Sequence, residues 1–382
     1  MSDYTIPLSD PDITTEELTA VNAVLQSPNL SGGPAVAEFE SAFAAYLGRK
    51  HAVAVASGTL GLLLALKASG IGPGSEVIAS PYSWRETAHA ITLAGARPVF
   101  ADIDYWALTL VPEKVEQRIT HNTRAIVAGN TNGHPAAWGP LRELAVRHQL
   151  ILIEDSTEAI GSAYTGALVG TFGNCAVFDF SQPSAITCGE GGMVVTDDPD
   201  MAATLRQLRA RRTDERCSIV AGARVPFQAR MSDLAATLGR VQLRRLEEIL
   251  AKRKRVENWY FEQIRSFEGI KHPYTAPEAT EVHWFLYLVH LGTRFSRSSR
   301  DAIVDDLQTE QIEAAAYCHP LHEQRHYVDL GYRRGNFLVT EKIADRAVAL
   351  PFHTHLAEQQ VAFIVSTMKD ASINVGAGSA IY

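Results

Sequence analysis

The amino-acid sequence predicts an α/β fold, in which a mainly parallel, seven-stranded sheet lies between helices and a smaller α+β domain follows. Up to about residue 200, short apolar runs rich in β-branched residues alternate with segments of helical length, a pattern typical of parallel sheets covered by helices. A long amphipathic pattern then leads out of this region. The chain of 382 residues is long enough for one large domain and a smaller companion.

Seven runs predict buried strands, because each is short, apolar and bounded by polar or turn-forming residues. They span residues 51–56, 76–80, 97–103, 124–129, 150–154, 175–180 and 192–196. Residues 60–68 carry apolar side chains at helical spacing before a glycine-rich exit, which predicts a helix. Residues 200–212 predict another helix, and residues 213–228 an irregular polar stretch.

The amphipathic pattern from residue 232 to about 265 predicts a long helix that leads out of the large domain. We therefore expect a large domain at 1–245 and a small domain at 246–382. Two runs of the small domain predict strands, and two segments predict helices. The strands are expected at 283–291 and 312–316, and the helices at 300–308 and 358–369.

Composition and charge narrow the class of protein. Hydrophobic residues make up 46% of the chain and charged residues 20%, as in an ordinary soluble globular protein. The net charge of -8 gives no reason to expect nucleic acid or an anionic membrane as a partner. The sequence offers neither a membrane span nor a signal peptide, and its four cysteines form no CxxC pair. We expect a cytoplasmic protein without a metal site.

Ser57, Gly58 and Thr59 stand between a predicted strand and a predicted helix. Backbone N–H groups at a helix N-terminus suit a phosphate group, and the threonine hydroxyl can add a further donor. The same three residues also form common turns and helix caps. The motif alone therefore leaves a phosphate site and a plain helix cap as alternatives.

Two more features follow predicted strands, at the edge where open α/β sheets place their ligands. Asp155 ends a very apolar run, and a buried acid needs a cation or strong hydrogen-bond donors. In pyridoxal-phosphate (PLP) enzymes that cation is the protonated pyridine nitrogen, whereas a helix N-cap is the structural alternative. Trp84 lies beyond the strand that ends at residue 80, where it can stack on a planar ring or serve as a core aromatic.

The order of these motifs along the chain resembles that of the DegT/DnrJ/EryC1/StrS family of sugar aminotransferases. The resemblance covers nearly the whole chain and implies a fold-type I aminotransferase that forms a homodimer with each active site at the subunit interface. It also implies PLP as cofactor and nucleotide-linked keto sugars or cyclitols as substrates. The motifs that carry it lie at residues 6–8, 57–59, 95–100, 154–155, 189–196, 230–232, 320–322 and 350–351.

The resemblance assigns roles to matching positions. It implies that Asp155 is the acid facing the pyridine nitrogen, that Trp84 stacks on the cofactor ring, and that Gly58 and Thr59 belong to the phosphate loop.

The family's Schiff-base lysine has no counterpart in this sequence. The spacing between Phe178 and Gly189 matches the family pattern and places Ser184 at the lysine position, and no lysine occurs between Lys114 and Lys252. A serine hydroxyl cannot form an imine with an aldehyde and is a poor base at neutral pH. We therefore do not expect ordinary transamination.

Three further positions depart from the family. Asp179 replaces a serine that donates to the cofactor phosphate, and a carboxylate repels a phosphate dianion. Gln228 replaces an asparagine that reaches the same phosphate from the partner subunit, and Glu158 stands where a glutamine lies near the ring. Asp155, Glu158, Asp179 and Ser184 are therefore candidates for acid, base and binding roles in a remodelled acidic pocket; drift in a pocket without chemical demand is the alternative.

Three hypotheses of function follow. In the first, the protein binds or acts on a small polar molecule, such as a sugar, cyclitol or amine, in a biosynthetic pathway without covalent PLP. In the second, it is an aminotransferase or dehydratase that holds PLP or pyridoxamine phosphate (PMP) noncovalently. In the third, it is a noncatalytic partner of an active paralogue.

Overall fold

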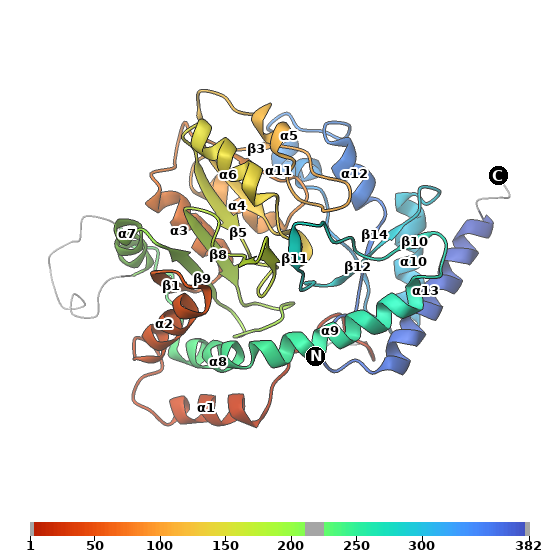
Figure 1. Cartoon of the computed structure of the whole chain (residues 1–382), viewed down its shortest axis with the longest axis horizontal. Helices are drawn as coiled ribbons and strands as arrows, with labels where there is room; N and C mark the ends of the chain where they lie inside the picture. Colours follow the sequence, from red (N-terminus) through yellow and green to blue (C-terminus); the bar gives the residue numbers. More distant parts are fainter. Residues whose placement is uncertain (1–3, 211–224, 379–382) are drawn as a thin grey trace.

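The computed structural model describes residues 4–210 and 225–378. Its centre is a seven-stranded sheet with helices on both faces (Figure 1), and the strand order is β1-β9-β8-β5-β4-β2-β3. The strands are β1 (His51–Val55), β2 (Glu76–Ala79), β3 (Arg97–Phe100), β4 (Thr123–Gly129), β5 (Ile151–Asp155), β8 (Cys175–Asp179) and β9 (Gly192–Thr196). Each corresponds to one of the seven predicted runs, which confirms the α/β fold class.

The sheet is mainly parallel, as predicted. Strands β2, β3, β4, β5 and β8 pair in parallel, whereas β9 pairs antiparallel with both β8 and β1. The carboxyl ends of the parallel strands consequently meet at one edge, where ligands of open α/β sheets bind. A small three-stranded sheet was not predicted: β6 (Ala163–Tyr164) pairs with β7 (Ala167–Leu168) and with β11 (Ala279–Glu281).

The helices of the first part cover the sheet by burying alternate strand residues, because successive side chains of a strand point to opposite faces. On one face, Val53 and Val55 pack with α3, α4 and α7. On the other, Ala52 and Ala54 pack with α2 and with α8 (Asp233–Arg244), and α6 covers β4 and β5. The helices are α1 (Thr15–Leu25), α2 (Ala35–Leu47), α3 (Gly58–Ala68), α4 (Arg85–Leu93), α5 (Pro112–Glu116), α6 (Trp138–Arg147) and α7 (Pro199–Arg209).

The C-terminal part contains an antiparallel four-stranded sheet of order β10-β12-β14-β13, as the α+β prediction requires. Its strands are β10 (Ile270–Lys271), β12 (Tyr287–Leu291), β13 (Ala315–Ala316) and β14 (Ala347–Leu350). Its helices are α10 (Arg297–Thr309), α11 (Arg325–Val328), α12 (Leu338–Ala344) and α13 (Glu358–Gly378). The domain boundary at residue 245 stays a prediction.

The amphipathic stretch predicted as one helix is two helices, α8 (Asp233–Arg244) and α9 (Leu246–Ile264), which meet at Arg245. The Arg245 guanidinium is buried and binds the carboxylates of Asp12 and Glu17. The junction therefore anchors the segment that begins α1. Most of the predicted irregular stretch 213–228 lies outside the described residues.

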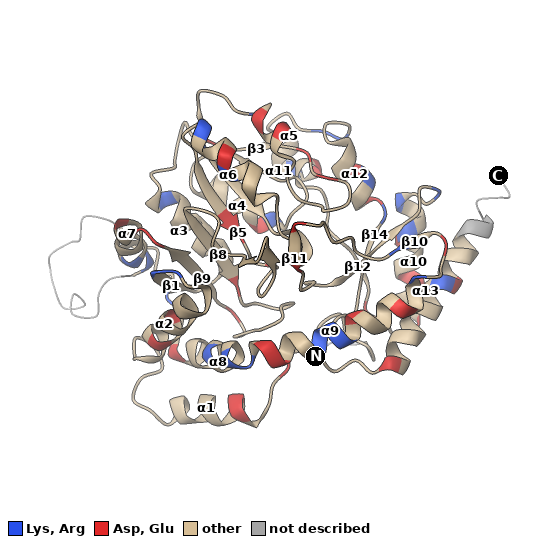
Figure 2. Ribbon diagram, in the orientation of Figure 1, with Lys and Arg blue, Asp and Glu red and all other residues tan. Residues whose placement is uncertain are grey.

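Acidic and basic residues are interspersed on α9 (Figure 2), where Lys252 pairs with Glu248 and Lys254 with Glu257. Among the described residues, no helix combines the length and the apolar character that crossing a bilayer would require.

Candidate functional site

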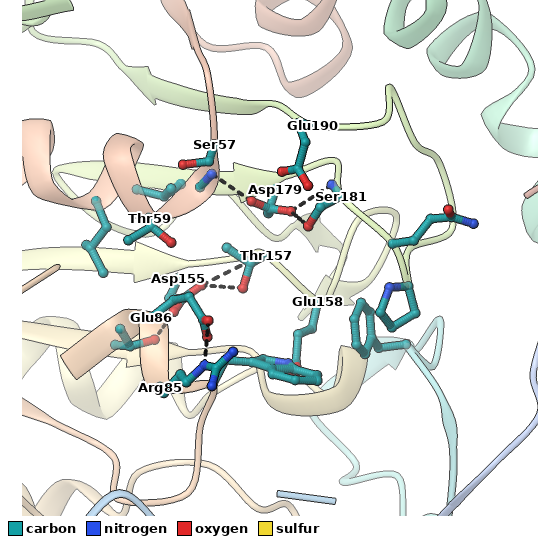
Figure 3. Close-up of a pocket in the computed structure, with 18 residues that line it drawn as sticks. Ser57, Thr59, Arg85, Glu86, Asp155, Thr157, Glu158, Asp179, Ser181 and Glu190 are labelled. Atoms are coloured by element: carbon teal, nitrogen blue, oxygen red, sulfur yellow. Dashed lines mark hydrogen bonds and ion pairs between the residues drawn. The ribbon is translucent and has the colours of Figure 1, made fainter. Parts of the chain in front are cut away.

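A pocket of about 450 Å³ opens at the carboxyl edge of the seven-stranded sheet. Asp155 ends β5 and Asp179 ends β8, while Gly58 and Trp84 stand at the starts of α3 and α4. Figure 3 shows these elements converging on one cavity. The lining residues are Ser57, Gly58, Thr59, Leu62, Trp84, Arg85, Glu86, Thr87, Asp155, Thr157, Glu158, Val177, Asp179, Ser181, Gln182, Pro183, Glu190 and Phe285.

Most of the predicted site residues lie together in this pocket: Gly58, Thr59, Trp84, Asp155, Glu158 and Asp179 all line it. Ser184 follows the lining residues Gln182 and Pro183 but does not itself line the pocket. Gln228 is exposed and outside the lining, so its expected reach to a partner subunit stays a prediction.

The carboxylate of Asp179 lies on the N-terminus of α3. Its Oδ2 accepts a hydrogen bond from the Gly58 N–H at 2.6 Å, and its Oδ1 accepts from the Ser181 N–H at 2.7 Å and from the Ser181 hydroxyl. The hydroxyl oxygen of Ser57 accepts from the Leu60 N–H at 3.2 Å. Two donors of the first turn of α3, the N–H groups of Gly58 and Leu60, thus have partners within the chain.

Asp155 is buried at the base of the pocket, where three donors hold its carboxylate. The Thr87 hydroxyl donates to Oδ2 at 2.8 Å, and the hydroxyl and N–H of Thr157 donate to Oδ1 at 2.7 and 3.2 Å. Burial raises the pKa of Asp155; the bonds from Thr157 and Thr87 oppose the rise, and the charge of Asp179 adds to it. Asp155 is thus a buried acid that hydroxyl and amide donors hold in a fixed orientation.

Glu158 is buried among donors from separate elements. The Trp84 indole N–H donates to Oε1, the Asn132 N–H donates to Oε2, and the Tyr317 hydroxyl lies 2.8 and 2.7 Å from the two oxygens. Burial raises the pKa of Glu158 to about 7; the hydrogen bonds oppose this rise, and the charge of Asp155 adds to it. Glu158 can therefore exchange a proton near neutral pH.

Trp84 is 38% exposed at the mouth of the pocket. Its ring meets Phe285 and Tyr317 edge-on, with centroids 6.1 and 6.2 Å apart. The prediction that it stacks on a ligand ring is not tested by these contacts.

Several residues of the site were not predicted from the sequence. Arg85 and Glu86 line the pocket and pair with each other at 3.1 Å; their position directly after Trp84 was the available hint. Phe285 and Tyr317 come from the C-terminal part, more than 100 residues away in sequence from Trp84 and Glu158, and no local pattern marks them.

The lining is strongly acidic. It holds five carboxyl side chains, those of Glu86, Asp155, Glu158, Asp179 and Glu190, against one guanidinium, that of Arg85. Every lysine of the sequence falls in residues 4–210 or 225–378, and none of them lines the pocket.

A separate cluster of His322, Glu323 and Glu341 brings three potential metal-ligand atoms within 4.8 Å. Its groups already have partners, because the His322 Nε2 bonds Glu341 at 3.0 Å and Glu323 pairs with Arg334 at 2.9 Å. We assign no metal to it.

The chain is similar to known aminotransferases and polysaccharide biosynthesis proteins. Residues 11–369 match the DegT/DnrJ/EryC1/StrS aminotransferase family. The chain is 37% identical over 339 residues to a GDP-perosamine synthase of Caulobacter vibrioides, covering 88% of this chain and 90% of that protein. It is 32% identical over 376 residues to the spore coat polysaccharide biosynthesis protein SpsC of Bacillus subtilis, covering 96% of each.

Solved structures of similar proteins share the fold of this chain. The PLP form of a putative sugar aminotransferase from Streptococcus pneumoniae has a TM-score of 0.91 at 26% identity, covering 97% of this chain and 100% of that one. DesV of S. venezuelae, in complex with a ketimine intermediate, has a TM-score of 0.88 at 31% identity, covering 96% and 98%. The chain thus has the fold-type I arrangement predicted from its sequence.

Proposed function

The chain belongs to the DegT/DnrJ/EryC1/StrS aminotransferase family, and we propose that it is a divergent member that forms no lysine imine with PLP. In this proposal it does not transaminate. It binds or acts on a small polar molecule in the acidic pocket, as part of a biosynthetic pathway.

The set of side chains in the pocket carries this proposal. An imine with an aldehyde cofactor requires a primary amine, and none of the lining side chains is a lysine. Ser184, which matches the lysine position by sequence spacing, supplies only a hydroxyl. The nucleophile and the proton shuttle of transamination are therefore both lacking in the pocket of this chain.

The remaining groups support a polar or amine-bearing ligand. Asp155, Glu158 and Asp179 present carboxyl groups to one cavity, and an ammonium or several hydroxyl groups would complement them. Glu158 is the group we propose as acid or base, because burial places its pKa near 7. Sugar and cyclitol derivatives carry several hydroxyl groups that can donate hydrogen bonds to these carboxylates. One relative of the chain is named as a putative sugar aminotransferase.

PLP fits the pocket only in part. Asp155 supplies a buried pocket acid of the kind that pairs with a pyridinium nitrogen, which supports noncovalent PLP or PMP as the second candidate ligand. The amine is lacking, and Asp179 already occupies a donor of the α3 N-terminus. The proposed activity therefore does not depend on the cofactor.

We also propose that the protein is a homodimer in which Gln228 faces the pocket of the partner subunit. Sedimentation should then give twice the mass of the chain, and a monomer at micromolar concentration would contradict this.

Visible absorbance tests the proposed function. Purified protein is mixed with PLP, its spectrum is recorded, and the mixture is dialysed. We expect the spectrum of free PLP and its complete loss on dialysis. A shifted PLP band that appears on mixing and disappears on dialysis favours the noncovalent candidate. A PLP band that survives dialysis contradicts the proposal.

A further inference from the structure

The N-terminus of α3 is the part of the pocket suited to an anion. Free N–H groups and the helix dipole attract negative charge at such an end. In this chain the anion at that end is a side chain: the Asp179 carboxylate accepts the Gly58 N–H at 2.6 Å.

The Asp179 carboxylate is held in this position from both sides. While Oδ2 faces Gly58, Oδ1 accepts from the N–H and the hydroxyl of Ser181. Turning the carboxylate away from α3 would break these bonds together. The side chain therefore behaves as a fixed cap of the helix.

No space remains between Asp179 and the first residue of α3. A Cβ atom built on Gly58 would lie 2.7 Å from Asp179 Oδ2 and 2.8 Å from its Cβ. Figure 3 shows Glu190 on the same side of the cavity as Asp179 and Ser57, while Arg85 lies on the opposite side. A phosphate at the N-terminus of α3 would thus lie near the carboxylates of Asp179 and Glu190, and it would have to displace Asp179 from the Gly58 N–H.

We infer that Asp179 is an internal anion that takes the place of a phosphate at α3, so that the pocket selects ligands without a phosphate group. The inference deepens the proposed function by naming a ligand class: an uncharged or amine-bearing polar molecule, without a phosphate monoester. The occupied Gly58 N–H and the negative charge of Asp179 both weaken the binding of a phosphate ester.

Pyridoxamine and PMP form a matched pair of probes. They differ only in the phosphate, and neither carries an aldehyde, so binding needs no lysine. Isothermal titration calorimetry of both probes is made on the native protein and on the Asp179→Ser and Asp179→Asn variants. Glu190→Gln is the matched control, since it removes one pocket charge but leaves the Gly58 N–H capped.

In the native protein, PMP should bind no more tightly than pyridoxamine. Asp179→Ser should raise PMP affinity by at least about tenfold, the value of one charge-assisted hydrogen bond, with pyridoxamine affinity changed less than about twofold. Asp179→Asn should show a smaller gain, because its amide oxygen can still face Gly58. Glu190→Gln should raise PMP affinity by less than either Asp179 variant does.

Tighter binding of PMP than of pyridoxamine to the native protein would overturn the inference. The inference would also be overturned if PMP affinity rose in neither of the two folded Asp179 variants, including the case in which neither probe binds. Such results would leave the proposed function standing, because that proposal fails only when PLP forms an imine with this chain.

Discussion

Glu158 joins parts of the chain that are distant in sequence. It accepts from Trp84 at the start of α4 and from Asn132 after β4, and it bonds Tyr317 beyond β13. A charge at this position costs desolvation, which explains the direction of its pKa shift. The folded state therefore holds the proton of Glu158 more tightly than the unfolded state does.

This shift predicts a pH dependence of stability. The pKa of Glu158 rises from 4.5 in the unfolded chain to about 7 in the folded protein. The folded state then binds more protons between these values, so the free energy of unfolding falls as pH rises through this window. Glu158→Gln should remove up to about 3 kcal/mol of that fall.

Urea unfolding of the native protein and of Glu158→Gln at about pH 5 and about pH 8 measures this difference. The exposed pocket residue Glu190 provides the control Glu190→Gln. Parallel pH profiles for the native protein and Glu158→Gln would show that Glu158 titrates normally.

At the scale of the element, the loop from β8 to β9 is folded back on itself. Phe180 accepts from the Cys188 N–H at 3.0 Å and from the Thr187 hydroxyl at 2.8 Å, and its own N–H donates to Gly191 at 2.9 Å. These bonds fix the ends of the segment that contains Ser184. A lysine introduced there would start from a defined backbone.

Ser184→Lys alone should give weak PLP binding, because Asp179 still occupies the Gly58 N–H. Adding Asp179→Ser and Gln228→Asn should strengthen binding by at least about tenfold by removing the repulsion and the competing cap. Absorbance titration with PLP measures each variant. Tight binding by the single variant would refute the charge argument.

The junction of α8 and α9 is the element-scale anchor for α1. Arg245 is buried with Asp12 and Glu17. Without it, Glu17 would be left as an uncompensated buried charge, whereas Asp12 would keep only its pair with Lys252 at 2.9 Å. Arg245→Met should lower the free energy of unfolding by about 3 kcal/mol. The neighbouring Arg244→Met is the matched control, because its pair with Glu16 is exposed and should change stability by less than about 1 kcal/mol.

Denaturant unfolding at fixed protein concentration compares the two variants. Equal effects of the Arg245 and Arg244 substitutions would mean that the buried cluster adds nothing beyond a surface pair.

At the scale of the whole molecule, the two larger sheets are joined by close backbone contact. The N–H of Phe285 donates to the Asn132 carbonyl at 3.2 Å, and that of Leu286 donates to the Asn132 side chain at 3.0 Å. Beside them, a Cβ on Gly133 would lie 2.2 Å from the His283 carbonyl oxygen. Pocket geometry depends on this contact, since Phe285 lines the cavity.

Gly133→Ala should therefore destabilise the protein by more than about 2 kcal/mol, because the methyl group overlaps backbone at a positive φ. Gly166→Ala is the control for the cost of the positive φ alone. The φ of Gly166, +84°, is similar to that of Gly133, but no atom lies within 4 Å of the added carbon. Melting temperatures of the two variants measure the difference. A loss in Gly133→Ala no greater than in Gly166→Ala would contradict the packing argument.

The strands were predictable because each run has a short apolar centre. Asp155 was predictable because it ends such a run, and Asp179 and Glu158 because they depart from the family pattern. The contacts between remote residues were not. Tyr317 bonds Glu158 across 159 positions, and only the folded chain brings them together. The break at Arg245 was also missed, since the amphipathic pattern continues through it while the buried ion pairs come from a distant segment.

The absence of a usable amine is the central claim, and borohydride trapping tests it most directly. Protein equilibrated with PLP is reduced, digested and mapped by mass spectrometry. We predict no stoichiometric pyridoxyl adduct at any lysine, and only trace labelling that scales with PLP concentration. One adduct per chain at a single lysine would contradict the account.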